Sequence, residues 1–352
     1  MENERAPNHR PSISGRCAQL PRHSTYACAR VRLTCGVTRA MAHLRLAEAA
    51  VELVTPEIQN AILMSSNRYG YLKKKLTDVV SKTAEVLIEQ SKRDGFDPVA
   101  FELAFGSGNF PPVSFTLSNG ATCELVGRID RVDTASIHDQ LYVRIVDYKS
   151  SKREIDFAEI YYGLAMQMLI YLKVLIEQAN AWTQENVAPA AALYFHVHRP
   201  LVAPAETDTD TERKVLESYQ MQGLLVDDPA ILEMMDRTAK LDQKKSIVIP
   251  VKYKKDGTLD ANTTKKVVSP PQLEQLMDHA IDLAQSSAEA MYDGEIGVEP
   301  YEYKERRPCQ TCPFQSVCHF DEALSNEARQ LKKLEKDDVL SRLGGDVDEV
   351  DE

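Results

Sequence analysis

Hydrophobic residues recur at helical spacing over residues 41–91. Leu72, Leu76 and Val79 stand four and three positions apart, which is the spacing of side chains on one face of a helix. Gly95 follows this pattern and is expected to end the helical region because glycine commonly terminates helices. The first part of the chain is therefore predicted to be α-helical.

Alternating hydrophobic and polar residues predict β-strands farther along the chain, because successive side chains of a strand point to opposite faces. The dipeptide Asn119-Gly120 suits a tight hairpin turn. A later amphipathic helix is predicted over residues 271–291, started by Ser269 and with prolines in its first turn. The predicted strands are 99–106, 114–117, 121–126, 141–149, 191–200 and 246–251. This mixture predicts an α/β fold.

Two carboxylates and a lysine are expected to meet in this sheet. Asp147 and Lys149 stand two positions apart in one predicted strand, so their side chains share a face. Residues 122–130 predict a second strand, and the polar link at residues 134–140 is short enough for a hairpin. We therefore expect Asp130 to lie beside Asp147, with Lys149 facing the same cleft.

This arrangement favours metal-dependent phosphodiester hydrolysis. Mg²⁺ or Mn²⁺ is usually held by one or two carboxylates, here Asp130 and Asp147, together with waters and phosphate oxygens. The metal lowers the pKa of a bound water and neutralises charge in the transition state, and Lys149 would orient that water or stabilise that charge. Gln167 and Tyr171 stand four positions apart on one helix face, from which they could position the lysine and the scissile phosphate.

Several motifs in order carry a resemblance to a known family. The sequences GRIDRVD at 127–133, VDYKS at 146–150 and G-x-x-x-Q-x-x-x-Y at 163–171 resemble the PD-(D/E)XK nuclease superfamily. More narrowly, residues 56–321 resemble the C-terminal, RecB-like nuclease domain of the B subunit of the bacterial AddAB-type ATP-dependent helicase/deoxyribonucleases. That narrower likeness rests on ELAFG, SFTLSNGATCELVGRIDRVD, ALYFHVHRP, GLLVDD and CQTCPFQSVCHFD.

The resemblance implies a fold, an activity and partners. It implies a restriction-endonuclease-like mixed sheet flanked by helices, closed by a C-terminal cysteine staple that binds metal. It also implies a DNA exonuclease that cuts the 5′-ended strand during double-strand break repair by homologous recombination, with an A subunit as partner, in the bacterial cytoplasm. The chain has no G-x-x-x-x-G-K-[ST] motif, so we do not expect it to hydrolyse ATP by itself.

Structural explanations compete with each of these assignments. A D-x-K in a strand is more often a solvated edge or an ion pair than a catalytic motif, and Asp130 could be paired with the arginines beside it. Gln167 and Tyr171 could be polar residues at the edge of the core. Glu102 could approach the metal, although pairing with an arginine is the better expectation. The pair His196 and His198 could bind metal, but a hydrogen-bonded or surface role is favoured.

Composition limits the possible partners without deciding the function. The 352 residues carry a formal net charge of −11, partly from an acidic run at residues 346–352 that we expect to be disordered. A nuclease needs only a local positive channel, so DNA is not excluded. No apolar run is long enough to cross a membrane. Basic residues cluster at Lys73, Lys74, Lys75, Lys252, Lys254, Lys255, Lys265 and Lys266.

Three regions are predicted along the chain. Residues 1–40 are rich in arginine, proline, histidine and serine and are predicted to be a disordered or non-native segment. Residues 41–325 are predicted to form the nuclease domain with its helical lead-in, and residues 326–352 a charged helical or disordered tail. The family carries a histidine on its first nuclease helix, and His43 resembles it only superficially.

Closely spaced cysteines near the C-terminus predict a metal site. Cys309 and Cys312 form a C-x-x-C, and Cys318 follows; such spacing suggests metal rather than a disulfide in a reducing compartment. These residues with His319 suit tetrahedral zinc. The resemblance implies instead a [4Fe-4S] cluster whose fourth ligand is a distant upstream cysteine. The upstream cysteines, none in the family's sequence context, are Cys17, Cys28 and Cys35, whereas Cys123 is expected to be buried and apolar.

Two other functions stay open at the sequence level. The atypical N-terminal segment allows a catalytically impaired fragment that serves as a DNA-binding or subunit-docking module. A stand-alone nuclease acting on RNA or on recombination intermediates is a further alternative.

Overall fold

The N-terminal part of the described chain is helical. The computed structural model describes residues 39–54, 66–106, 110–183, 185–200, 207–239, 245–321 and 327–344. Helix α1 spans Arg39–Val54 and helix α2 spans Asn67–Ser91, which confirms the helical pattern over these two stretches and its end before Gly95. Residues 55–65 of the predicted helical region lie outside the described residues. The chain divides into two compact units, residues 1–84 and 85–352. Within the first unit, Lys73 on α2 lies 3.8 Å from Glu52 on α1.

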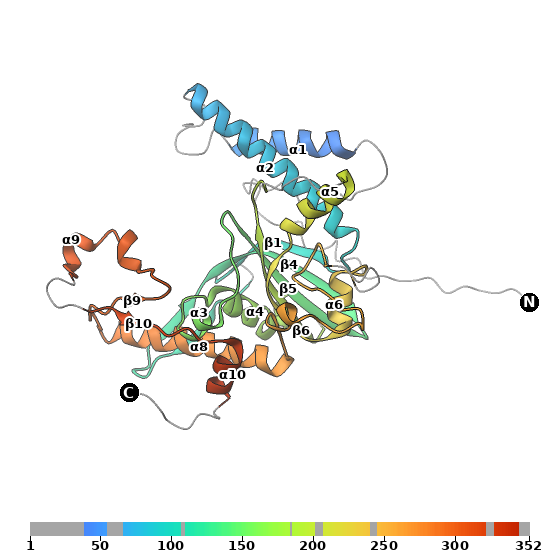
Figure 1. Cartoon of the computed structure of the whole chain (residues 1–352). Coiled ribbons are helices and arrows are strands. Elements are labelled where there is room, and N and C mark those ends of the chain that lie inside the picture. The colour runs from blue at the N-terminus through green and yellow to red at the C-terminus, as the bar shows by residue number, and fades with distance from the viewer. Residues whose placement is uncertain are drawn as a thin grey trace, which may run out of the picture. The chain divides into compact units, whose positions relative to one another are not determined.

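A six-stranded mixed sheet forms the centre of the second unit (Figure 1). Its order is β1-β4-β5-β6-β7-β8, with parallel pairing of β5 with β6 and of β7 with β8, and antiparallel pairing elsewhere. This confirms the mixed α/β sheet expected from the sequence. The strands are β1 (Asp97–Phe105), β4 (Gly127–Ile137), β5 (Gln140–Lys149), β6 (Val187–His196), β7 (Gln222–Val226) and β8 (Val267–Val268).

Two smaller sheets accompany the central one. The predicted hairpin around Asn119-Gly120 is confirmed, because β2 (Val113–Thr116) pairs antiparallel with β3 (Thr122–Leu125). The other small sheet joins β9 (Tyr301–Glu302) to β10 (Arg329–Gln330) in parallel. It brings together two segments on either side of the cysteine motif.

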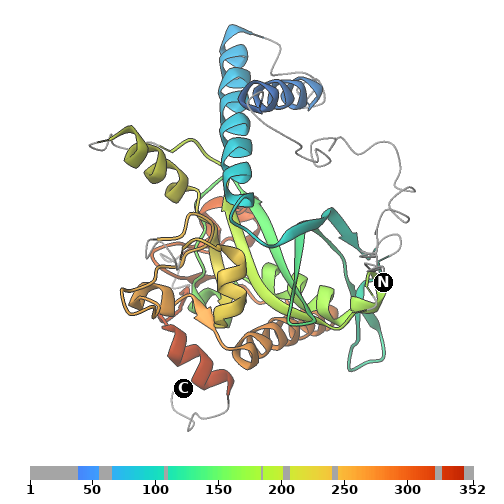
Figure 2. The same ribbon diagram turned by 90° about the vertical axis from the view of Figure 1, so that its right-hand side faces the viewer.

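Helices cover the sheet and connect its strands. Helix α4 packs against β5, β6 and α8, and Figure 2, turned from Figure 1, shows the long helix α8 running beneath the strands. The helix predicted after Ser269 is confirmed as α8, which starts with a capping box between Ser269 and Gln272. The remaining bounds are α3 (Phe157–Tyr161), α4 (Gln167–Glu177), α5 (Asp208–Ser218), α6 (Pro229–Met235), α7 (Ala261–Thr264), α8 (Pro270–Tyr292), α9 (Gln315–Cys318) and α10 (Lys336–Leu343), with 3₁₀ turns η5 (Ala179–Ala181) and η6 (Pro308–Thr311). Among the described residues, no helix has the length and apolar character needed to span a bilayer.

The strand boundaries near the predicted site differ from the expectation. Residues 122–130 are not one strand, because β3 ends before Val126 and β4 begins after it. Most of the predicted link at 134–140 belongs to β4 and β5. The turn consists of His138 and Asp139, which both have positive φ angles of 48° and 62°, as tight hairpins between twisted strands require.

The prediction of a strand at residues 246–251 is wrong. The chain turns back on itself there, with the Ser246 N–H donating to the Val251 carbonyl at 2.9 Å. The Ser246 hydroxyl accepts from the backbone N–H groups of Val248 and Ile249 at 3.0 and 3.1 Å. All of these residues are buried, and a short run of apolar residues does not distinguish a buried strand from a buried turn.

A chain of buried ionic groups crosses the interior on one face of the sheet. Arg144 is fully buried and donates to Asp133 at 2.9 Å and to Asp94 at 3.1 Å. Arg131 donates to the other oxygen of Asp133 at 2.6 Å and to the Tyr148 hydroxyl at 3.4 Å. Two arginines and two carboxylates thus balance their charges, as buried ions must to offset their desolvation.

We expect Arg144→Met to lower the free energy of unfolding by about 3–5 kcal/mol, because it leaves Asp94 and Asp133 without their shared partner. Urea denaturation followed by circular dichroism measures this loss. The matched control is Arg128→Met. The Arg128 side chain is 64% exposed and lies 3.6 Å from Glu102, so its loss should cost less than about 1 kcal/mol. Equal effects in the two variants would contradict the role given to the buried chain.

Candidate active site

Asp147 and Lys149 lie at the end of β5 and face the same side of the sheet. Lys149 Nζ lies 2.7 Å from Asp147 Oδ2, which confirms that these side chains share a face. The carboxylate is 8% exposed and the lysine 31%, so the acid is buried while the base reaches the surface. Tyr148 points to the opposite face, where its ring packs edge-on against Phe195 at 5.7 Å.

Asp130 is brought beside Asp147 by the pairing of β4 with β5. The register pairs Arg131 with Val146, and Asp130 and Asp147 stand one position farther along these antiparallel strands. Asp130 Oδ2 accepts a hydrogen bond of 2.9 Å from the backbone N–H of Tyr148. The expected convergence of the two carboxylates is therefore present.

The local electrostatics favour a cation beside Asp147. Burial raises the pKa of Asp147 above its ordinary value and the nearby Asp130 raises it further, while the Lys149 ammonium opposes both effects. Asp147 Oδ2 is buried and, apart from its ion pair with Lys149, has no hydrogen bond of good geometry. A buried carboxylate oxygen without an aligned donor is a costly arrangement that a bound cation would relieve.

The donor set at Asp130 and Asp147 fits Mg²⁺ or Mn²⁺. Both ions prefer oxygen ligands and are often held by one or two carboxylates, with waters and substrate oxygens completing the shell. The described residues contain no group of three or more histidine, cysteine, aspartate or glutamate side chains placed to hold a metal. A metal here would thus depend on two carboxylates together with water and phosphate.

Gln167 and Tyr171 lie on α4 and contact each other. Gln167 Nε2 donates to the Tyr171 hydroxyl at 3.2 Å. The Tyr171 ring packs edge-on against Phe105 at 5.4 Å, and a Cβ added to Gly127 would lie only 2.9 Å from this ring. The tyrosine is therefore placed at the start of β4, three residues before Asp130. That these two residues position Lys149 and the scissile phosphate, as the sequence suggested, stays a prediction.

The competing structural explanations are resolved for several residues. Arg128 pairs with Glu102 and Arg131 with Asp133, which places Glu102 in an ion pair, as favoured from the sequence. The favoured role of the two histidines is also confirmed. The His196 ring donates to the Ser150 carbonyl at 3.3 Å and the His198 ring to the His196 carbonyl at 3.0 Å.

Sequence reasoning missed the residues that continue the site across the sheet. The register pairs Asp147 with Tyr194 and Tyr194 with Gln222, so the three side chains form a row on one face. Lys149 is paired with His196 in the same way. Alternation along β6 could have placed Tyr194 and His196 on one face. That this face continues the row from Asp147 is shown only by the order of the strands in the sheet.

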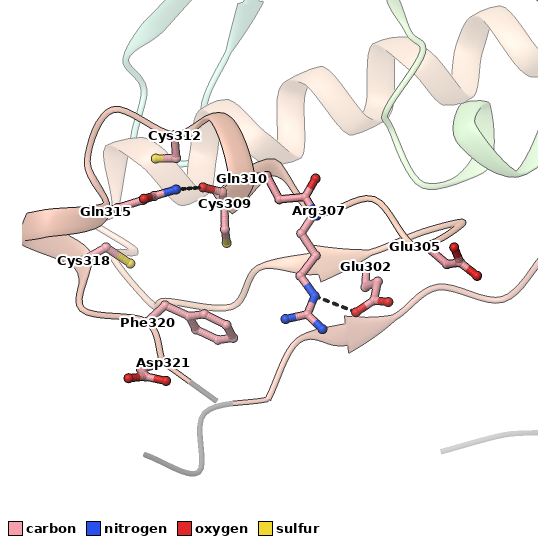
Figure 3. A pocket seen from close by; sticks show the side chains of 10 residues that line it. All are labelled: Glu302, Glu305, Arg307, Cys309, Gln310, Cys312, Gln315, Cys318, Phe320 and Asp321. Carbon is pink, nitrogen blue, oxygen red and sulfur yellow. Dashed lines mark hydrogen bonds and ion pairs between the residues drawn. The ribbon is translucent and has the colours of Figure 1, made fainter. Parts of the chain in front are cut away.

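The three C-terminal cysteines line one cavity of about 480 Å³ (Figure 3). Cys309, Cys312 and Cys318 are free thiols, and the backbone N–H of Phe314 donates to Cys312 Sγ at 3.4 Å. His319, the fourth zinc ligand considered from the sequence, does not line this cavity. Cys17, Cys28, Cys35 and the side chain of His43 lie outside the described residues.

The chain belongs to the PD-(D/E)XK nuclease superfamily, whose family model matches residues 26–319. That range includes Asp130 and Asp147-Tyr148-Lys149, the residues that resemble the first acid and the D-x-K of the superfamily in the sequence analysis.

Several proteins that are similar to this chain in sequence carry the name of the B subunit of an ATP-dependent helicase/deoxyribonuclease. The Exiguobacterium sibiricum protein of this name is 53% identical over 300 residues, which cover 85% of this chain and 26% of the relative. The Bacillus subtilis protein is 43% identical over 296 residues, covering 83% and 25%. The chain spans about a quarter of the length of the curated relatives it matches.

We expect Gly127→Ala to lower the free energy of unfolding by about 1–3 kcal/mol, since the added methyl group overpacks the site. The new Cβ would lie 2.6 Å from the Phe105 ring and 2.9 Å from the Tyr171 ring. Gly70→Ala is the control, because no atom lies within 4 Å of its added Cβ and helix α2 favours alanine by up to about 1 kcal/mol. Thermal and urea unfolding measure the stability of both variants. A free energy of unfolding of Gly127→Ala equal to that of wild type would contradict the close approach of Gly127 to the two rings.

Proposed function

We propose that this chain is a Mg²⁺- or Mn²⁺-dependent deoxyribonuclease domain. The observation that carries the proposal is the convergence of Asp130, Asp147 and Lys149 at the paired ends of β4 and β5. Membership of a nuclease superfamily and the deoxyribonuclease names of the relatives support it.

Each residue has a separate task in the proposed reaction. A bound divalent ion supplies an activated water and neutralises charge on the phosphate, and Asp130 and Asp147 are the residues that would hold it. Because the Tyr148 N–H holds Asp130, the orientation of that carboxylate is fixed before any ligand arrives. Lys149 reaches the surface beside Asp147, where its ammonium can bind a phosphate oxygen and stabilise developing negative charge. Tyr171, held by Gln167, is proposed to position the phosphate.

We further propose the biological setting from the relatives. They are bacterial helicase/deoxyribonuclease B subunits, which supports a cytoplasmic role in double-strand break repair by homologous recombination, with an A subunit as partner. On this proposal the chain supplies the nuclease domain, assigned to residues 41–325. Exonucleolytic cutting of the 5′-ended strand is part of the same proposal.

We propose a [4Fe-4S] cluster at the cysteine cavity, with zinc as the alternative. The three thiols line one cavity, and thiolates are ligands that both groups prefer. In the described residues the thiols are not gathered closely enough to hold a metal, so binding would have to draw them together. In Figure 3, Cys309 and Cys318 point into the hollow beside the Phe320 ring. Cys309, Cys312 and Cys318 are the proposed ligands.

We expect Asp147→Asn to reduce Mg²⁺-dependent cleavage of labelled single-stranded DNA by more than about 100-fold, as loss of a key charge in an active site commonly does. Asp130→Asn and Lys149→Gln should have effects of the same order. The control is Asp139→Asn in the exposed turn of the same hairpin, which should cleave at the wild-type rate. Wild-type cleavage by Asp147→Asn with unchanged folding would refute the assignment.

Anaerobic purification should yield roughly four iron and four sulfide ions per chain if the cluster forms. Cys312→Ser should lose both, together with the visible absorption, whereas Cys123→Ser should keep them because Cys123 lies in β3 outside the cavity. Iron and sulfide assays and zinc analysis are the measurements. One zinc ion per chain without iron would contradict the cluster and support a zinc site instead.

A further inference from the structure

A second cavity opens directly beside Lys149. It has a volume of about 180 Å³ and contains Lys149, Lys152 and Arg153 but no carboxylate among its lining residues. We call this cavity the basic cleft. Lys149 is paired with Asp147 and Lys152 with Glu154, while Arg153 makes no ion pair with a described residue. The cleft therefore offers one unpaired cation and two ammonium donors to an anion beside Lys149.

Aromatic rings line the basic cleft beside those cations. His196 and His198 stack with ring centroids 3.9 Å apart and planes 7° apart, and Tyr194 also lines the cleft. Burial lowers the pKa of His196, and the neighbouring His198 lowers it further, so the His196 ring is neutral near pH 7. Stacked rings beside cations resemble the surfaces on which proteins hold unpaired bases.

The strand register places this stack next to the catalytic groups. Asp147 pairs with Tyr194, and Lys149 pairs with His196. Paired residues on adjacent strands share a face of the sheet, with strands about 4.8 Å apart. A phosphate at Lys149 would therefore have its base or its neighbouring base within reach of the His196 ring.

A larger hollow of about 1050 Å³ continues from the basic cleft. The two share Lys152, Ser218, Gln220 and Gln222 as lining residues. The larger one holds eight lysines and six carboxylates. Three of these lysines, Lys245, Lys252 and Lys265, are exposed and make no ion pair with any described residue. Lys252 and Lys265 act on Asp260 and Glu335 only through longer-range electrostatics, so the three ammonium groups can still contact phosphates that follow the one at Lys149. We call this second cavity the lysine hollow.

We propose that the basic cleft and the lysine hollow together form the binding track for single-stranded DNA. One base stacks on the His196–His198 pair, and the phosphates beyond it run over Lys245, Lys252 and Lys265. This inference rests on the proposed nuclease function and adds where and in what form the substrate binds. A cavity of about 180 Å³ with a stacking surface suits an unpaired nucleotide, whose base face is free, rather than a duplex, whose bases are stacked internally.

The first test measures binding without cleavage. Fluorescence anisotropy of a labelled oligothymidylate is recorded with the full chain in EDTA at several salt concentrations. The double variant Lys252→Gln/Lys265→Gln should bind about tenfold more weakly. The slope of log affinity against log salt concentration should become less steep by about 1.4, since each lost phosphate contact contributes about 0.7 to that slope. Lys254→Gln with Lys255→Gln removes the same charge outside both cavities and should leave the slope unchanged. Equal slopes for the two double variants would overturn the track.

The second test addresses stacking. His196→Ala should bind oligothymidylate about tenfold more weakly, within the range seen when a base-stacking ring is removed. His196→Phe, which keeps a ring, should restore most of the affinity. An oligomer of abasic sites should bind wild type and His196→Ala equally. Weak binding by both His196 variants, or the same loss with the abasic oligomer, would overturn the stacking role.

These measurements separate the inference from the nuclease proposal. If wild type cleaves DNA but the two double lysine variants bind alike, the nuclease proposal stands and the track is wrong. If binding follows the track yet no Mg²⁺-dependent cleavage occurs, the track stands and the nuclease proposal fails. Thermal unfolding confirms that every variant is folded.

Discussion

The pairing of β4 with β5 is the constraint on which the site depends. Asp133 on β4 is the register partner of Arg144 on β5, and the two side chains form a fully buried ion pair. A shift of the register by one residue would separate these charges and turn every side chain to the other face of the strand. Because the buried pair disfavours such a shift, the ends of the same strands keep Asp130 next to Asp147.

The two faces of β5 therefore have different tasks. On one face, Arg144 and Tyr148 belong to the buried ionic chain that begins at Asp94. On the other face, Asp147 and Lys149 form the candidate site. Tyr148 links the faces, since its hydroxyl accepts from Arg131 while its backbone N–H holds Asp130. The geometry of the site is thus set by residues that take no part in the proposed chemistry.

The segment that leads to the cysteines is tied to the helices near the site. The Asp156 side chain caps α3 by accepting from the Ala158 N–H at 2.9 Å, and it also accepts from Tyr303 at 2.9 Å and from Lys304. Burial alone would raise the pKa of Asp156, but the hydrogen bonds from Lys304 and Tyr303 bring it below its ordinary value. One carboxylate therefore joins the two residues that follow β9 to the start of α3, the helix that precedes α4.

The sequence by itself determined the mixed α/β character, the hairpin at Asn119-Gly120, the capped helix α8 and the shared face of Asp147 and Lys149, because alternation, turn residues and caps are local signals. It made the link around His138 too long, because residues 134–137 and 140 belong to the strands. It also made a strand of residues 246–251, where burial on all sides leaves no periodicity to follow. Only the tertiary structure decided that Tyr194, His196 and Gln222 continue the row begun at Asp147. That row depends on which strands become neighbours, and the physical reason is that contacts between strands distant in sequence are set by the packing of the whole sheet.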